Sequence, residues 1–455
     1  MTAGAPSRLA WKGPAHAPES NETGRFSGDN RLADGDRRAH QWYRFVLSFP
    51  PHLVRRYASE FGLDTTSLLL DPFCGTGTTL VEAKKLGVPS AGIEAHPFTA
   101  FAASVKVDWS PDPYELLEHA RGIAEETLEH LREDGVNDSP LEGSARSASP
   151  SGRLRGLDPS LSSLLLTSSI SRRPLHKALV LLEALHAQRD DRYDAHERLA
   201  FAHSIVQSSS NLRFGPEVGL GEVKSDAPVV APWLQAVSLI SEDLGSLGGA
   251  RRIPARVYAG DARRASDLVA RESVDAVFTS PPYPNEKDYT RTTRLESVLL
   301  GFISDRDSLR AVKRGLVRSN TRGVFKADDD DVLVASHKEI SRVAAAIEAR
   351  RVELGKTSGF ERLYPRVAKL YFGGMLRHLT NLRSVLKPGA RLAYVVGDQA
   401  SYLRVMIRTG QLLGDLAESA GYELERIDLF RTRHATATGE QLREEVVVLR
   451  WPGEA

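Results

Sequence analysis

The chain has 455 residues, more than one typical domain, and 41% of them are hydrophobic, which is enough for a sizeable core. Its 60 basic and 59 acidic residues leave a net charge of +1, so composition gives no global argument for nucleic acid and any basic surface must be local. The single cysteine, Cys74, excludes a disulfide framework and a cysteine-cluster metal site, and no apolar run reaches the roughly 20 residues of a membrane span. We therefore expect a cytoplasmic protein without a signal peptide, membrane contact or metal site.

The N-terminal segment changes character near residue 39. Residues 1–38 combine Gly, Pro, Ser, Asn and Asp with few apolar positions, a composition typical of a mobile arm. The aromatic-rich residues 40–51, which include Phe49, precede a periodic apolar pattern that predicts an amphipathic helix. Its apolar face consists of Leu53, Val54, Tyr57, Ala58 and Phe61.

Residues 68–83 predict a buried strand that leads into a helix through a tight loop. Gly75 and Gly77 remove side chains where backbone must approach a ligand, and Thr78 or Thr79 can cap the helix. Such a loop is typical of a nucleotide site, and an ordinary strand-to-helix turn is the alternative.

A second predicted strand, residues 91–94, ends in Glu94. A carboxylate at this place holds a ribose diol in doubly wound folds, unless the acid stands there by chance. Leu80 occupies the position of the third glycine of a dinucleotide fingerprint, which disfavours nicotinamide and flavin cofactors. His96, just beyond the strand, is a candidate for the wall of an adenine pocket.

The middle of the chain has helical periodicity in residues 111–131, 176–210 and 232–247. A Ser/Gly/Arg-rich stretch, residues 135–173, separates the first two and predicts a flexible loop. We therefore expect a helical insertion over residues 111–249.

The α/β pattern resumes in residues 256–261, a predicted strand that ends in Asp261. Residues 274–279 form the next predicted strand, which leads directly into Ser280-Pro281-Pro282-Tyr283. Because open α/β sheets bind ligands at the carboxyl ends of their strands, this tetrapeptide and the glycine loop are expected at one rim. A strand broken by prolines, with Tyr283 in the core, is the alternative. The strands that complete a seven-stranded sheet are residues 390–396, 423–430 and 444–451.

Together these motifs resemble the S-adenosylmethionine-dependent amino-methyltransferases of DNA. The first motif is Asp71-Pro72-Phe73-Cys74-Gly75-Thr76-Gly77-Thr78-Thr79, the second is Ser280-Pro281-Pro282-Tyr283, and the resemblance covers residues 40–105, 255–283 and 366–455. It implies an α/β fold, a Rossmann-like seven-stranded methyltransferase sheet with two largely helical insertions. The resemblance implies a mobile arm (1–38) and a catalytic domain in three parts (39–110, 250–283 and 366–455). The first insertion (111–249) is a candidate for target recognition. The second insertion (284–365) is a candidate for DNA contact.

The resemblance also implies roles for single residues. Asp71, Phe73, Gly75 and Gly77 would hold the methionine part of the cofactor S-adenosylmethionine, Glu94 its ribose and Asp261 its adenine. The full cofactor-binding set is Phe49, Asp71, Phe73, Cys74, Gly75, Thr76, Gly77, Thr78, Thr79, Glu94, His96 and Asp261. The catalytic set is Ser280, Pro281, Pro282 and Tyr283.

The tetrapeptide suits transfer to an exocyclic amino group, whose lone pair is delocalised into the base ring. Acceptors for the amino protons draw the nitrogen towards sp³ and hold it in line with the sulfonium methyl. We expect the Ser280 hydroxyl and the Pro281 carbonyl to be these acceptors, with Pro282 stiffening the loop. Tyr283 would stack on a base swung out of the duplex.

The serine in first place is most similar to the branch that modifies N4 of cytosine, since adenine enzymes more often begin the motif with Asp or Asn. Transfer to cytosine C5 is disfavoured because it needs a Cys nucleophile in a Pro-Cys motif, whereas Cys74 lies in the cofactor loop. We therefore predict site-specific N4-cytosine methylation of double-stranded DNA with base flipping, in restriction-modification or phage defence, with a cognate restriction endonuclease as a candidate partner. The alternatives are adenine N6, an RNA or protein amide, or a catalytically silent DNA-binding module.

The second insertion is rich in cations next to the catalytic loop. Cations so placed fit phosphate contacts, which position DNA without reading it, and a solvated helix face is the alternative. The predicted DNA-contact residues are Lys287, Arg291, Arg294, Arg318 and Arg322. Further candidates are Arg251, Arg252, Arg263, Arg264, Arg306, Arg310, Lys313, Arg314 and Lys326.

Overall fold

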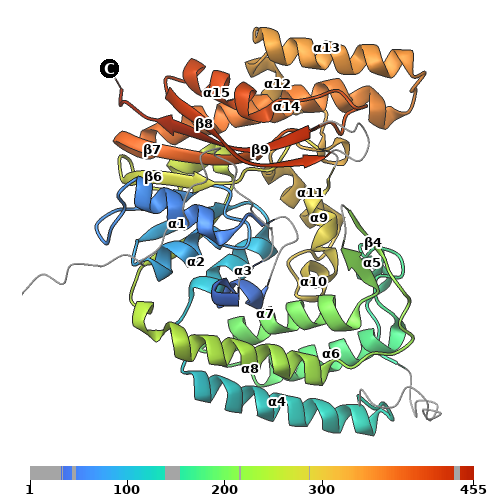
Figure 1. Ribbon diagram of the computed structural model, residues 1–455. Coiled ribbons are helices and arrows are strands. Elements are labelled where there is room, and N and C mark those ends of the chain that lie inside the picture. Colours follow the sequence, from blue (N-terminus) through green and yellow to red (C-terminus); the bar gives the residue numbers. More distant parts are fainter. Residues whose placement is uncertain are drawn as a thin grey trace, which may run out of the picture.

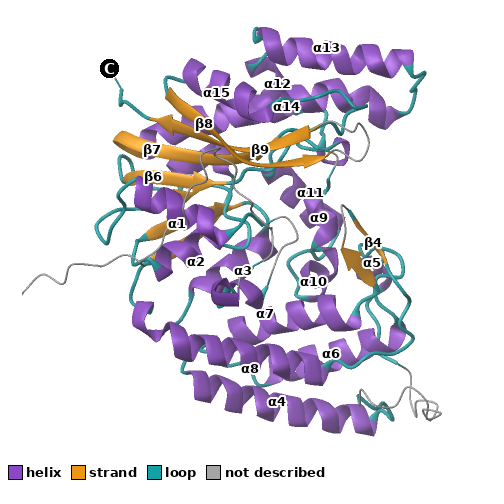
Figure 2. Ribbon diagram, in the orientation of Figure 1, coloured by secondary structure: helices purple, strands orange, loops and turns teal. Residues whose placement is uncertain are grey.

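The computed structural model describes residues 32, 34–43, 48–138, 154–214, 217–285, 287–434 and 441–454. A seven-stranded sheet lies at its centre, with helices on both sides (Figures 1 and 2). The strands of this sheet are β1 (Leu69–Asp71), β2 (Ser90–Glu94), β5 (Ala255–Ala259), β6 (Val274–Thr279), β7 (Leu386–Gly397), β8 (Glu423–His434) and β9 (Gln441–Arg450).

The strand order is β5-β2-β1-β6-β7-β9-β8. The first five strands are parallel, and β9 is antiparallel to both of its neighbours. The predicted seven-stranded sheet with a terminal hairpin is confirmed. The hairpin is longer than predicted, because pairing continues to His434 opposite Gln441.

Both faces of the sheet are buried, which explains why its strands read as nearly continuous apolar runs. One face packs on α1 (Pro51–Glu60) and α2 (Thr78–Lys85), and the other on α14 (Gly359–Leu382) and α15 (Thr409–Ser419). Successive residues alternate between the two cores. Leu69, Ala276, Phe278, Ala393 and Val395 face the first, and Leu70, Val277, Leu392, Tyr394 and Val396 face the second.

A separate helical core lies at the β5 side of the molecule (Figure 1). Its helices are α3 (Pro97–Val107), α4 (Pro113–Glu133), α6 (Arg172–Ala187), α7 (Asp194–Ser204) and α8 (Val230–Leu247). The predicted helical character of the first insertion is therefore confirmed, with two additions. A two-stranded antiparallel sheet, β3 (Leu212–Phe214) and β4 (Val218–Leu220), follows a π-helical turn (Ile205–Ser209), and a short helix, α5 (Pro159–Ser162), precedes α6.

The second insertion supplies short helices beside the rim and one long helix at the far end of the molecule (Figure 1). They are α9 (Tyr289–Thr292), α10 (Arg294–Leu299), α11 (Arg306–Gly315), α12 (Asp330–Leu333) and α13 (Lys338–Glu353). The proposed boundary at residue 365 falls inside α14, which continues through Pro365. Short 3₁₀-helices span Asp34–Asp36, His40–Trp42, Gly248–Ala250, Ala262–Asp267, Thr321–Gly323 and Arg383–Val385.

Parts of several predictions lie outside the described residues. These parts are most of the arm at 1–38, residues 139–153 of the Ser/Gly/Arg-rich stretch and residues 435–440 of the terminal hairpin. Among the helices that the structure describes, none is long and apolar enough to cross a membrane.

Candidate active site

The glycine loop and the Ser-Pro-Pro-Tyr loop meet at one rim of the sheet. They follow β1 and β6, which are parallel neighbours, with Leu69 opposite Ala276 and Leu70 opposite Val277. The strand order reverses at this pair, and such a switch point is where open α/β sheets bind ligands. The pairing of β1 with β6 therefore brings together two loops that are far apart in the sequence.

The Asp71 carboxylate holds the two loops together. It accepts hydrogen bonds from Thr79 Oγ1 at 2.5 Å and from Thr279 Oγ1 at 2.5 Å, and also from the Phe73 backbone N–H at 3.1 Å. Asp71 is fully buried, and burial raises its pKa to about 6 although these donors act in the opposite direction. Its side chain is thus used to join the loops.

A cavity of about 290 Å³ opens at this rim. All four residues of the tetrapeptide line it. The predicted cofactor residues that line it are Phe49, Phe73, Cys74, Gly75, Thr76, Thr78, Glu94, His96 and Asp261. Asp71, Gly77 and Thr79 lie behind this lining; Gly77 has a φ of +84° and approaches Ala103 of α3 so closely that a Cβ would lie 3.2 Å from the Ala103 Cβ.

Glu94 is oriented by the backbone of the loops around it. Its Oε2 accepts from the Gly75 N–H at 2.9 Å and its Oε1 from the His96 N–H at 2.7 Å. Each carboxylate oxygen has a further lone pair for a ligand hydroxyl. Burial, and then the charge of Arg294, lower the pKa of the His96 side chain to about 4, so this wall of the cavity is neutral near pH 7.

Cys74 lies in the glycine loop with its thiol turned against β2. A Cβ added at Gly92 would lie 2.7 Å from the Cys74 Sγ, so only glycine allows β2 to pass under the loop. Burial raises the pKa of Cys74 well above its ordinary value, which keeps the thiol protonated. The requirement for glycine at position 92 was not predicted, because it depends on a contact between separate elements.

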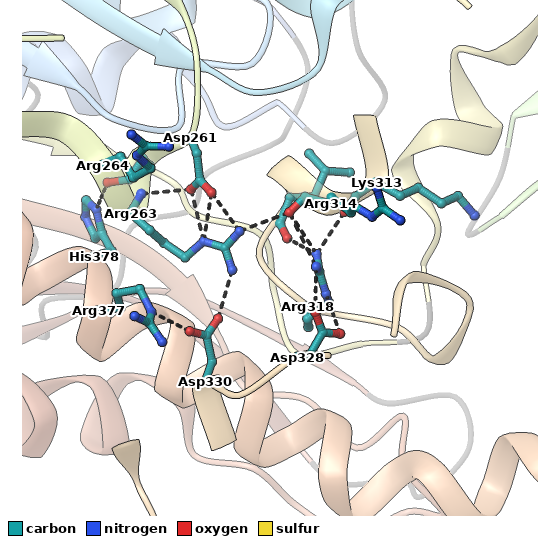
Figure 3. A network of polar contacts seen from close by, with 12 residues as sticks. Asp261, Arg263, Arg264, Lys313, Arg314, Arg318, Asp328, Asp330, Arg377 and His378 are labelled. Atoms are coloured by element: carbon teal, nitrogen blue, oxygen red, sulfur yellow. Dashed lines mark hydrogen bonds and ion pairs between the residues drawn. The ribbon is translucent and has the colours of Figure 1, made fainter. Parts of the chain in front are cut away.

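Asp261 is the pocket end of a charged network that reaches the second insertion (Figure 3). Its carboxylate accepts from Arg263 Nε at 3.0 Å and from Arg263 Nη2 at 2.7 Å. The same guanidinium donates to Asp330 Oδ2 at 2.8 Å and to the Arg314 carbonyl at 3.1 Å, and Arg377 donates to Asp330 Oδ1 at 2.6 Å. Arg263, a candidate for DNA contact from the sequence, is therefore used inside the protein.

In the Ser-Pro-Pro-Tyr loop, the Ser280 hydroxyl donates to the Val395 carbonyl of β7 at 3.1 Å. A hydroxyl has one hydrogen and two lone pairs, so this bond leaves the oxygen as an acceptor. The Tyr283 ring packs on β7 two residues further along, where a Cβ at Gly397 would lie 3.2 Å from Tyr283 Cε2. Both side chains are thus positioned by the neighbouring strand.

The second insertion also covers part of the cavity, which sequence reasoning missed. Residues 315–320 line it, and two hydrogen bonds to this segment and one ion pair of the helix before it hold it in place. Asn320 Nδ2 donates to the Lys287 carbonyl at 3.0 Å, the Tyr402 hydroxyl donates to the Ser319 carbonyl at 2.7 Å, and Lys313 forms an ion pair with Asp288 at 2.9 Å. These long-range contacts leave no motif in the sequence.

Two of the five predicted DNA-contact residues are buried. Arg294 donates to the Thr290 and Leu164 carbonyls at 3.0 and 3.1 Å, and Arg318 forms an ion pair with Asp328 at 2.8 Å. As placed, neither presents its guanidinium to a phosphate, because each compensates polar groups inside the protein. Lys287 and Arg291 are half-buried and Arg322 is exposed, and further exposed cations are Arg306, Arg310, Arg314 and Lys326.

The lining of the cavity fits the cofactor that the resemblance implies. A Cβ added at Gly75 would meet nothing within 4 Å, so the glycine leaves open space beside the Glu94 carboxylate. That space adjoins a neutral imidazole and an anchored aspartate, which suit ribose hydroxyls and an adenine amino group. The apolar lining near Phe49 and Phe73 suits the rest of an S-adenosylmethionine molecule.

Comparisons with known proteins agree with this geometry. A family model described as DNA methylase matches residues 11–103. The type II methyltransferase M.BsoBI of Geobacillus stearothermophilus is 25% identical over 461 residues, which cover 96% of this chain and 88% of that protein. M.AvaI of Nostoc sp., also a type II methyltransferase, is 23% identical over a region that covers 91% of this chain and 86% of that protein.

Among solved structures, TrmN from Thermus thermophilus aligns with 91% of this chain and 52% of its own at 11% identity, and its TM-score of 0.30 is too low to bear on the fold. The assignment depends instead on two motifs that share one rim and on relatives that align with more than nine-tenths of the chain. The family model and both relatives support an S-adenosylmethionine-dependent DNA amino-methyltransferase, of the family that modifies cytosine N4 or adenine N6.

Proposed function

We propose that this DNA methyltransferase transfers a methyl group to the N4 amino group of cytosine, at a specific site of duplex DNA. The observation that carries the proposal is the bond from the Ser280 hydroxyl to the Val395 carbonyl. Because the hydroxyl hydrogen is used in that bond, the Ser280 oxygen can only accept from a substrate, and an exocyclic amino group offers two hydrogens. The serine at this position also favours the cytosine N4 branch.

The proposed reaction is a direct transfer. When bound, S-adenosylmethionine supplies an electrophilic methyl group on its sulfonium. The amino protons of the base bond to Ser280 Oγ and the Pro281 carbonyl, which draws the nitrogen lone pair out of the ring. A bond forms from that nitrogen to the methyl carbon as the carbon–sulfur bond breaks, and one amino proton is released to water. Tyr283 stacks on the flipped base and keeps the nitrogen in line.

The relatives M.BsoBI and M.AvaI support a type II enzyme, which would protect its own DNA beside a restriction endonuclease of the same specificity. We infer that exposed cations of the second insertion, such as Arg322, contact DNA phosphates. Their contribution should appear as a salt dependence of DNA binding that becomes weaker when they are replaced.

The direct test is to incubate the full chain with methyl-labelled S-adenosylmethionine and unmodified DNA, RNA or protein, and to identify the modified product after digestion. N4-methylcytosine is expected. N6-methyladenine would refute the cytosine assignment, and label found only in RNA or protein would refute action on DNA.

Variants of the catalytic loop test the roles of its side chains. Ser280→Ala should lower kcat by about 100-fold or more, in line with the loss of one preorganised polar group in other active sites. Cofactor affinity should be retained in Ser280→Ala and in Tyr283→Ala. Ser246→Ala, on the outside of α8, and Tyr114→Ala, whose side chain is exposed, are matched controls and should behave as the wild type. Loss of cofactor binding in the loop variants would contradict the proposed roles.

A further inference from the structure

The cavity continues past the catalytic loop towards the antiparallel strands, a part to which no motif assigns a role. Beyond Tyr283 its lining consists of Val395, Gln399, Phe430, Arg431 and Glu444. The cofactor residues follow β1, β2 and β5, on the other side of β6 in the strand order. The catalytic loop therefore stands between the cofactor end of the cavity and this second end.

Strand register brings the second end close to Tyr283. Gly397 of β7 pairs with Glu444 of β9, and Glu444 pairs with Arg431 of β8, so the three residues form one row across the sheet. A Cβ built at Gly397 would lie 3.2 Å from Tyr283 Cε2 and 3.5 Å from Glu444 Cγ. The Tyr283 ring and the Glu444 side chain thus flank the same point of β7.

The Arg431 side chain leans along this row towards the catalytic loop. Its Nε donates to Glu444 Oε2, which brings the guanidinium from β8 back over β9. Phe430 supports it, with the guanidinium carbon 5.5 Å from the ring centroid. The Nη1 and Nη2 atoms make no hydrogen bond to any residue that the structure describes. The site thus holds a half-buried guanidinium, oriented by a carboxylate, with donors left for a ligand.

We propose that the Arg431 guanidinium binds the ring edge of the flipped target base and selects cytosine over adenine. This assignment rests on the proposed function, since it takes the base from that reaction. In cytosine the amino group is followed along the ring by N3 and then O2, which are both acceptors. A guanidinium presents parallel donors that match two neighbouring acceptors, whereas the corresponding edge of adenine has the acceptor N1 followed by the C2–H, which accepts nothing. Ser280 and Pro281 would then bind the amino end of the base and Arg431 its far edge.

Glu444 has two functions in this arrangement. It neutralises a guanidinium that would otherwise be desolvated without a partner when the base enters, and it limits the orientations of the Arg431 side chain. Lysine at position 431 could keep the ion pair but has no planar fork. The Arg431→Lys protein should therefore keep the fold and lose part of the preference for cytosine over adenine.

The test compares the full-length wild type with Arg431→Ala, Arg431→Lys and Arg426→Ala. Arg426 is a matched control, because it lies on the same strand, forms ion pairs with Glu60 and Asp428, and does not line the cavity. Each protein receives methyl-labelled S-adenosylmethionine and unmodified plasmid DNA. The measurements are kcat/KM for DNA, the ratio of N4-methylcytosine to N6-methyladenine in the digest, the Kd of the cofactor and the melting temperature.

Arg431→Ala should lower kcat/KM for DNA by roughly tenfold or more and reduce the cytosine-to-adenine ratio, since a good bidentate contact discriminates between bases by about that factor. Arg431→Lys should show a smaller change in the same direction. Arg426→Ala should match the wild type, and the cofactor Kd should be unchanged in all three variants.

The failure of this assignment can be distinguished from that of the proposed function. If the wild type makes N4-methylcytosine and the folded Arg431→Ala and Arg431→Lys proteins keep its kcat/KM and base ratio, the role of Arg431 is refuted alone. A cofactor Kd that weakens as much as kcat/KM falls would also refute it, because Arg431 would then serve the cofactor end. A wild type that makes only N6-methyladenine refutes the proposed function and, with it, the selection of cytosine.

Discussion

Replacement of Arg263 by Met tests whether the charged network in Figure 3 prepares the cofactor end of the cavity. Methionine keeps much of the side-chain volume and removes every donor. Asp330 keeps its bond from Arg377 at 2.6 Å, whereas Asp261 loses its guanidinium partner. The Asp261 side chain is only 20% exposed, so its charge would be left poorly compensated.

The expected cost follows from this asymmetry. Breaking a fully buried ion pair costs about 3–5 kcal/mol, and the partial access of Asp261 to the cavity places the loss of unfolding free energy nearer about 2–3 kcal/mol. Cofactor affinity should fall by about tenfold, because the Asp261 carboxylate must be ordered again on binding. Asp261→Asn combined with Arg263→Met should recover part of the stability, since a neutral amide needs no countercharge.

The assays are chemical denaturation for stability and calorimetric titration with S-adenosylmethionine for affinity. Arg264→Met is the matched control, because Arg264 is an exposed neighbour whose side chain bonds only to Asp267 among the described residues. A folded Arg263→Met protein that binds the cofactor within twofold of the wild type would refute the reasoning. Equal destabilisation by Arg264→Met would show that the charged network adds no more to the free energy of unfolding than an exposed ion pair does.

Three further changes follow from contacts at the site. Gly397→Ala places a methyl group 3.2 Å from the Tyr283 ring, so kcat should fall by about tenfold with cofactor affinity unchanged, and normal turnover would show that the ring moves freely. Cys74→Ala should retain methyl transfer within about threefold by the labelled assay, because burial raises the thiol pKa, whereas complete loss would indicate covalent chemistry. Burial raises the pKa of Glu296 from 4.5 to about 7, so its contribution to stability is present below pH 4.5 and lost as the pH rises through 7. Glu296→Gln should therefore gain roughly 3 kcal/mol of unfolding free energy relative to the wild type between about pH 5 and pH 8, and parallel pH profiles would contradict this.

The sequence by itself determined the sheet and the positions of the glycine loop and the Ser-Pro-Pro-Tyr loop. Apolar runs marked the parallel strands because both faces of the sheet are covered, and this property is local to each strand. Gly75 and Gly77 marked the first loop, and the proline pair before Tyr283 marked the second, because turn geometry restricts residue choice at single positions. The rule that ligands bind at strand ends then placed both loops at one rim.

Only the tertiary structure decided which charged side chains face the site. Arg294 donates to the Leu164 carbonyl, 130 residues away in the chain. In the sequence, nothing distinguishes this buried arginine from the exposed cations of the second insertion. Asp71 joins two loops instead of lining the cavity. Arg431 lines the cavity because it lies on β8 directly opposite Glu444 of β9, which also lines it. The physical reason is that periodicity and turns depend on near neighbours in the chain, whereas the partner of a buried charge is chosen by packing between segments far apart in sequence.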